Sequence, residues 1–60
     1  MGRIAYTIAG AADAASVPED IIVTAVQRRE LVARRVKGKR AVILATDIQA
    51  WVESMPSYLD

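Results

Sequence analysis

Pro18 stands between two stretches whose apolar residues recur with helical spacing, and this break constrains the fold more than any other feature. The first stretch has the i, i+3, i+4, i+7 spacing of an amphipathic helix, carried by Ile8, Ala11, Ala12 and Ala15. Thr7 is the expected N-cap of this helix. Proline has no backbone N–H and is tolerated only near the start of a helix, so the segment Ser16–Pro18 separates two helices.

A second helix is expected from about Pro18 to Arg28 or Arg29. Glu19 and Asp20 fall in its first turn, where negative side chains complement the helix dipole. Its inward stripe consists of Ile22, Ala25 and Val26, with Val17 packing from the turn. Two helices joined by so short a turn form a helix-turn-helix.

The segment from Val32 to Leu44 has the pattern of a short β-hairpin. Val36 precedes Lys37-Gly38-Lys39, and the apolar run Ala41–Leu44 follows it. Gly38 is expected to supply the positive φ that the tight turn needs.

A third helix is expected to begin with Thr46 or Asp47 as its cap and to be stopped by Pro56. Its apolar stripe consists of Ile48, Trp51, Val52 and Met55. Trp51 is the single tryptophan of the chain, and we expect it to anchor the core rather than to stack on a ligand.

The resulting order is helix, turn, helix, hairpin, helix, in a single domain over residues 1–60. We expect a mainly α-helical fold with a small β-hairpin, which is the layout of a winged helix-turn-helix. An N-terminal arm is expected over about residues 1–6 and a C-terminal tail over about residues 56–60. Ile21 lies beside the inward stripe of the second helix, and we expect the Ile4–Tyr6 segment to cover it; the alternative is an exposed contact surface.

Basic residues gather between Arg28 and Arg40. This segment holds seven basic residues and one acid, Glu30, and carries a formal charge of +6, whereas the rest of the chain carries −5. Such polarised charge in a small domain is a layout that a polyanion bound on one face would require. A solvated basic loop is the alternative, and charge alone favours neither.

With DNA as the polyanion, the outward face of the second helix is the part that enters the major groove. That face carries Glu19, Asp20, Val23, Thr24, Gln27 and Arg28. Gln27 suits adenine, Arg28 suits guanine or phosphate, Val23 or Thr24 suits a thymine methyl group, and an acid suits the cytosine amino group. The hairpin is expected to clamp the DNA backbone or the minor groove through Arg34, Arg35, Lys37, Lys39 and Arg40. Lysines at a strand edge also prevent aggregation, which is a purely structural explanation.

The composition offers little for catalysis. The chain has no histidine, no cysteine and no glycine-rich phosphate loop, so we expect no enzyme activity, no metal and no cofactor. No apolar run approaches the roughly 20 residues of a membrane span, so we expect a soluble, cytoplasmic protein without a membrane partner.

Three ordered segments resemble the excisionase and MerR-like helix-turn-helix family. They are Tyr6-Thr7-Ile8-Ala9 with Ala11-Ala12 and Ser16–Ile22, then Glu30-Leu31 with Ala33–Val36 and Lys37–Arg40, and finally Thr46–Val52. Together they extend over roughly residues 6–53. The chain departs from the family at Ser16 and Arg29, where the family often has glycine, and at Pro18, where it has a serine or threonine cap.

Members of this family that consist of the domain alone are phage excisionases, also called recombination directionality factors. They bind side by side on an attachment site, bend the DNA and help integrase to excise the prophage. The resemblance therefore implies three partners in the cytoplasm of a bacterial host cell: double-stranded DNA, a phage integrase and neighbouring copies of the chain. It places Thr24, Gln27 and Arg28 at bases or the adjacent backbone. A small phage repressor with the same domain is one alternative, and a protein-interaction module that binds no DNA is another.

Overall fold

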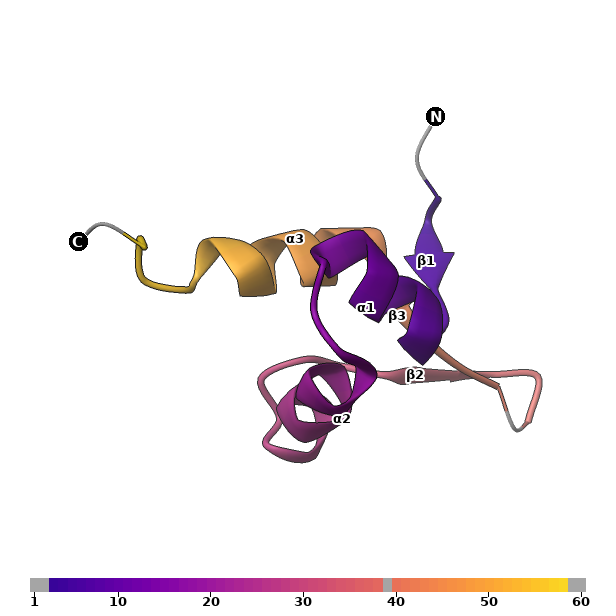
Figure 1. Ribbon diagram of the computed structural model, residues 1–60. Helices are drawn as coiled ribbons and strands as arrows, with labels where there is room; N and C mark the ends of the chain where they lie inside the picture. Colours follow the sequence, from indigo (N-terminus) through magenta and orange to yellow (C-terminus); the bar gives the residue numbers. More distant parts are fainter. Residues whose placement is uncertain (1–2, 39, 59–60) are drawn as a thin grey trace.

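A computed structural model describes residues 3–38 and 40–58 of the chain. Within this part it contains three helices and a three-stranded antiparallel sheet, so the fold is mixed α and β (Figure 1). The elements, in order, are β1 (Ala5–Tyr6), α1 (Ile8–Ala15), α2 (Glu19–Gln27), β2 (Arg34–Val36), β3 (Arg40–Leu44) and α3 (Ala45–Glu53). The predicted order of helix, helix, hairpin and helix is confirmed, and β1 is an addition that the sequence did not indicate.

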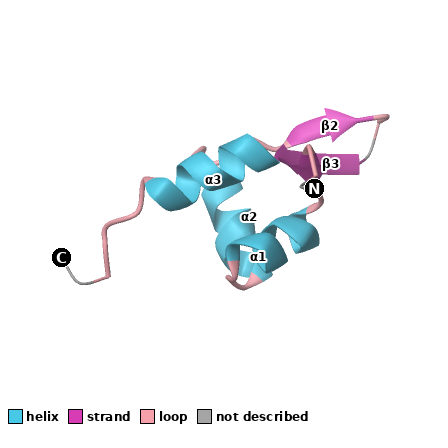
Figure 2. Ribbon diagram, turned by 90° about the horizontal axis from the view of Figure 1, so that it is seen from above, coloured by secondary structure: helices cyan, strands magenta, loops and turns pink. Residues whose placement is uncertain are grey.

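The sheet has the order β1-β3-β2, with β3 in its centre. Tyr6 of β1 pairs with Ile43 of β3, and on the other side Arg34 of β2 pairs with Val42. The β2–β3 hairpin and the C-terminal end of α3 lie at opposite ends of the molecule (Figure 2).

The start of α1 is fixed by Thr7, as predicted. The Thr7 hydroxyl oxygen accepts a hydrogen bond of 3.0 Å from the backbone N–H of Gly10, which satisfies one of the free donors of the first turn. A Cβ atom at Gly10 would lie 3.2 Å from this oxygen and 3.4 Å from Cδ1 of Tyr6. Glycine at this position therefore lets Tyr6 and the cap pack closely against the helix.

Both α1 and α2 end in the same hydrogen-bonding pattern. Ser16 after α1 has φ 60°, and Val17 N–H donates to the Ala12 carbonyl at 3.0 Å. Arg29 after α2 has φ 64°, and Glu30 N–H donates to the Ala25 carbonyl at 2.8 Å. This is the Schellman motif, which needs a left-handed residue just beyond the helix. Neither position holds the glycine that adopts this conformation without strain.

The predicted range of α2 is confirmed to within two residues. Pro18 is the residue before the first turn, with φ −65°, and its side chain makes no capping hydrogen bond. Glu19 and Asp20 occupy the first turn, where their charges offset the exposed N–H groups of the helix.

The core lies between the helices and β3. Its buried side chains are Ala11, Ala12, Ile22, Ala25, Leu31, Ile43, Ile48 and Trp51. Tyr6, Ile8, Val17 and Val26 are half-buried and pack against this cluster. Trp51 is only 6% exposed, which confirms that it is a packing residue.

The predicted cap of α3 at Thr46 or Asp47 is wrong, because the helix begins at Ala45 with Leu44 as its N-cap. The chain passes from β3 into α3 without a loop, because the strand ends at Leu44 and the helix begins at Ala45. The backbone N–H of Ala45 donates to the Ile4 carbonyl at 2.8 Å. Asp47 therefore lies within the first turn of α3.

The predicted stripe of α3 holds only in its first half. Ile48 and Trp51 are buried, but Val52 is 44% exposed and Met55, at 46%, lies beyond the helix. The helix ends at Glu53, and the Ser54 hydroxyl donates to the Trp51 carbonyl at 2.6 Å. Met55 precedes Pro56, and a residue before proline is disfavoured in the helical conformation.

The expectation that Ile21 is covered by the N-terminal arm is also wrong. Ile21 is 43% exposed and Ile4 is 84% exposed. The arm pairs with β3 instead, through Ala5 and Tyr6, because that pairing satisfies backbone groups that would otherwise be left at the sheet edge.

Glycine at either left-handed position is expected to stabilise the protein. Ser16→Gly and Arg29→Gly should each raise the free energy of unfolding by about 1 kcal/mol, because a side chain in this conformation is strained. Urea denaturation followed by Trp51 fluorescence measures the change. Ala14→Gly is the matched control, since Ala14 is helical and the substitution should cost about 1 kcal/mol. Destabilisation by both Ser16→Gly and Arg29→Gly would contradict the assigned backbone.

Candidate nucleic-acid interface

One face of α2 is free of the core. Ile22 and Ala25 are buried on the inner side of the helix, at 0% and 3% exposure. All six residues predicted for the outward face are exposed: Glu19, Asp20, Val23, Thr24, Gln27 and Arg28. In the view of Figure 1, α2 and the β2–β3 hairpin lie along the lower side of the molecule, opposite the N-terminus.

Charge changes sign along α2. Its first turn carries Glu19 and Asp20, whereas Arg28 and Arg29 follow its last turn. This arrangement matches the helix dipole at both ends. It also means that a phosphate group is repelled at the start of α2 and attracted at its end.

The hairpin is basic on both faces. Arg34 and Val36 point to one side of β2 and Arg35 to the other, because side chains alternate along a strand. Arg40 pairs with Val36 and so shares the face of Arg34. These arginines and Lys37 are all exposed. Lys39 lies outside the described residues, so its assignment to this surface stays a prediction.

The turn of the hairpin has the predicted glycine conformation. Gly38 has φ 86°, and Lys37 before it has φ 50°. A Cβ atom added at Gly38 would meet nothing within 4 Å, so space does not explain the glycine. Its conformational freedom does, because positive φ costs a residue with a side chain about 1 kcal/mol or more.

One ion pair ties the hairpin to α3. Arg34 Nη2 lies 4.0 Å from Asp47 Oδ2, and no other ion pair is present among residues 3–38 and 40–58. The distance is too long for a hydrogen bond, and Oδ2 is buried without a hydrogen-bond partner among these residues. The Arg34 side chain is 55% exposed, so the pair contributes little to stability. Its main effect is that Asp47 places a negative charge at the base of a basic hairpin.

The sequence reasoning missed two features of this surface. Ile21 is exposed on α2, and its position at the side of the helix left that outcome open. The Arg34–Asp47 pair joins a strand to a helix, and nothing in the spacing of the two residues indicates it.

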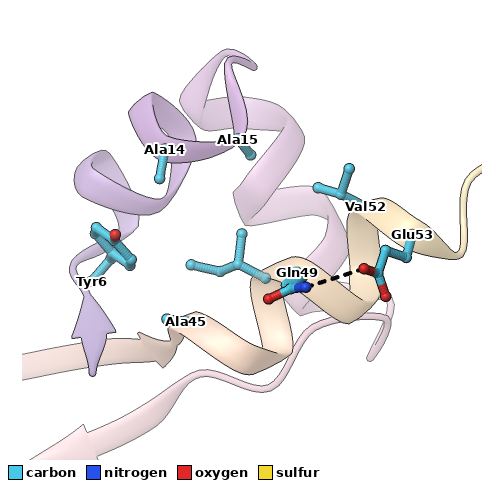
Figure 3. Close-up of a pocket in the computed structure, with 8 residues that line it drawn as sticks. Tyr6, Ala14, Ala15, Ala45, Gln49, Val52 and Glu53 are labelled. Carbon is cyan, nitrogen blue, oxygen red and sulfur yellow. Dashed lines mark hydrogen bonds between the residues drawn. The ribbon is translucent and has the colours of Figure 1, made fainter. Parts of the chain in front are cut away.

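A hollow with a volume of about 500 Å³ lies between α1 and α3, away from the basic hairpin (Figure 3). Its lining is mostly apolar and comprises Tyr6, Ala14, Ala15, Ala45, Ile48, Gln49, Val52 and Glu53. Along the α3 side of this hollow, Gln49 Nε2 donates to Glu53 Oε2 at 3.1 Å. Among the described residues, no three His, Cys, Asp or Glu side chains lie close enough together to hold a metal ion.

None of the described helices has the length and apolar character that a membrane-crossing segment requires. Comparison of the chain with protein-family models, with curated proteins and with solved structures finds no match. Functional assignment therefore depends on the exposed residues, their charges and their arrangement.

Substitution of Gly38 tests whether the hairpin turn depends on the left-handed conformation. Gly38→Ala should lower the free energy of unfolding by about 1 kcal/mol. Gly38→Asn should cost less, because asparagine adopts positive φ more readily than alanine. Thermal unfolding of the two variants measures the difference. Equal stability of Gly38→Ala and the wild type would contradict the assigned turn.

Proposed function

We propose that the protein is a winged helix-turn-helix DNA-binding protein without catalytic activity. In this proposal α1 and α2 form the helix-turn-helix, α2 is the recognition helix, and the β2–β3 hairpin is the wing. One observation carries the proposal: α2 and the β2–β3 hairpin lie along one side of the molecule (Figure 1). The outward residues of α2 are exposed there, and the hairpin has exposed arginines on both of its faces. Charged and polar side chains in that arrangement suit a long, regular polyanion better than a small ligand.

The charges of the wing and of α2 predict different roles for the two elements in DNA binding. The wing and the Arg28–Arg29 pair supply contacts to phosphate, which fix position but carry no sequence information. The outward face of α2 supplies contacts to base edges in the major groove. A wing with arginines on both faces suits a groove lined by phosphates on two sides, and arginine favours a narrow minor groove.

Within this class we propose that the protein acts as a phage excisionase. The support is the sequence resemblance together with the backbone at Ser16 and Arg29. These are the two positions at which the resembled family often has glycine, and both have positive φ here. Cooperative binding to attachment-site DNA, DNA bending and cooperation with an integrase in a bacterial cell are parts of this proposal. Avidity between neighbouring copies would compensate for the weak binding of one small domain.

An electrophoretic shift with the DNA that flanks the gene is the first test. Ladder-like shifts with altered mobility of bent probes, followed by stimulation of excision in an integrase assay, are expected for an excisionase. Binding at a promoter without any effect on integrase would favour the repressor. The absence of a shift at low salt would overturn DNA binding altogether.

A protein-interaction module is the second candidate function. The apolar hollow between α1 and α3 and the exposed Val52 and Met55 favour it. Salt-insensitive binding of a protein partner, with no DNA shift at low salt, would support this candidate.

The wing should account for much of the salt dependence of DNA binding. Replacement of Arg34, Arg35, Lys37 and Arg40 by alanine should reduce the slope of log K against log salt by about 3 to 4, since each lost phosphate contact contributes roughly 0.9. Arg3→Ala removes an exposed charge from the N-terminal side of the molecule and serves as control. Fluorescence anisotropy with labelled duplex at several salt concentrations measures both slopes. Equal slopes for the fourfold variant and the wild type would contradict the role of the wing.

Loss of the Asp47 charge should strengthen DNA binding. Asp47→Asn removes a negative charge from the base of the wing and releases Arg34 for phosphate. We expect affinity to rise by up to about fivefold, which corresponds to the ~1 kcal/mol upper range of an exposed ion pair. Asp13→Asn, on the exposed face of α1, is the matched control and should have a smaller effect. Weaker binding by Asp47→Asn, with stability unchanged, would show that Asp47 orients Arg34 for DNA instead.

A further inference from the structure

We infer that α2 selects A·T base pairs and that thymine methyl groups are required for this selection. The inference rests on the proposed function, because it concerns what the same helix reads in the major groove. It is carried by four exposed residues of α2, defined here as the readout stripe: Asp20, Val23, Thr24 and Gln27.

The readout stripe forms one continuous line along the helix. Its members are spaced i, i+3, i+4 and i+7, so they share a face. Ile22 and Ala25, which are buried, fix the opposite face against the core. The stripe is therefore the part of α2 that points away from the protein.

The centre of the stripe is apolar. Val23 is 37% exposed and is absent from the cluster of side chains that pack on the core. Thr24 beside it presents a second methyl group and a hydroxyl. Val and Thr are β-branched and have low helix propensity, so propensity does not explain their presence on an exposed helix surface. In the major groove the apolar feature of a base edge is the C5-methyl group of thymine, which such side chains contact.

The two ends of the stripe are compatible with the same base pair. Gln27 pairs with adenine through the N6 amino group and N7. Asp20 is an acceptor and suits an exocyclic amino group, which adenine and cytosine both present. Its charge also keeps this end of α2 away from phosphates and toward the middle of the groove.

The stripe lacks the side chains that read guanine. Arginine or lysine bound to guanine O6 and N7 is the commonest specific contact, and none of the four residues is basic. Arg28 and Arg29 follow the last helical residue, Gln27, and so lie outside the stripe. An A·T pair offers an amino group and a methyl group on the same major-groove edge, with thymine O4 between them, and this combination matches the composition of the stripe.

The test begins with selection of bound duplexes from a random-sequence library by the full chain, followed by replacement of each selected thymine with deoxyuridine. Deoxyuridine keeps base pairing and removes only the C5-methyl group. We expect a selected core of A·T pairs and a loss of affinity of about fourfold per critical methyl, the value expected for one buried methyl group.

Two variants assign the effect to the readout stripe. Val23→Ala and Thr24→Ser remove methyl groups from exposed positions, and circular dichroism checks that each variant folds. Each should bind thymine-containing DNA more weakly and lose most of its sensitivity to deoxyuridine. Arg3→Ala should keep the full sensitivity of the wild type.

The outcomes separate the inference from the proposed function. A selected core of G·C pairs, or equal affinity for thymine and deoxyuridine sites, would overturn the inference while DNA binding stands. Sensitivity to deoxyuridine that persists in both Val23→Ala and Thr24→Ser would also overturn it. Failure of the wild type to bind any duplex at low salt would overturn the inference and the proposed function together.

Discussion

Ala11 and Ala12 have almost no exposed surface, and because their side chains are single methyl groups they bring α1 close against α2. The contact buries Ile22 and Ala25 on the facing side of α2. In a chain of 60 residues few other contacts are available to orient this helix. The packing of α2 against Ala11 and Ala12 thus fixes the rotation of α2 about its own axis, and this rotation decides which side chains face outward.

The charge layout follows from the same orientation. With its apolar side against α1, the helix carries carboxylates at its start and arginines beyond its end. Each group is favourable for the helix dipole, so the layout supports folding of the helix whatever α2 binds. The hairpin adds a second group of exposed arginines, which follows α2 in the sequence.

Local signals in the sequence predicted most of the fold. Thr7, the stripe around Ile22 and the glycine at position 38 each act through neighbours within a few residues, and each is confirmed. The errors concern contacts between distant segments. The pairing of β1 with β3 and the bond from Ala45 to Ile4 join the N-terminal segment to residues 43–45, and no local pattern indicates them. Met55 is different, because its position before Pro56 was a readable signal that the helix ends earlier.

The candidate site could be predicted in outline for a related reason. Residues on a helix face follow from the helical period once the buried stripe is known, so the exposure of Thr24 and Gln27 could be anticipated. The ion pair between Arg34 and Asp47 could not, because it depends on how the hairpin meets α3. The pair changes how much Arg34 is expected to contribute to the proposed DNA binding, but the set of basic residues in the hairpin stays the same.

The direct passage from β3 into α3 has a mechanical consequence. Leu44 is both the last residue of the strand and the cap of the helix, so no flexible joint separates them. The directions of β3 and α3 are therefore coupled, and the pairing with β1 holds the strand at Ile43 and Leu44, just before the helix begins. A change in the direction of β3 would turn α3 with it, whereas α2 is joined to β2 through a separate segment, residues 28–33.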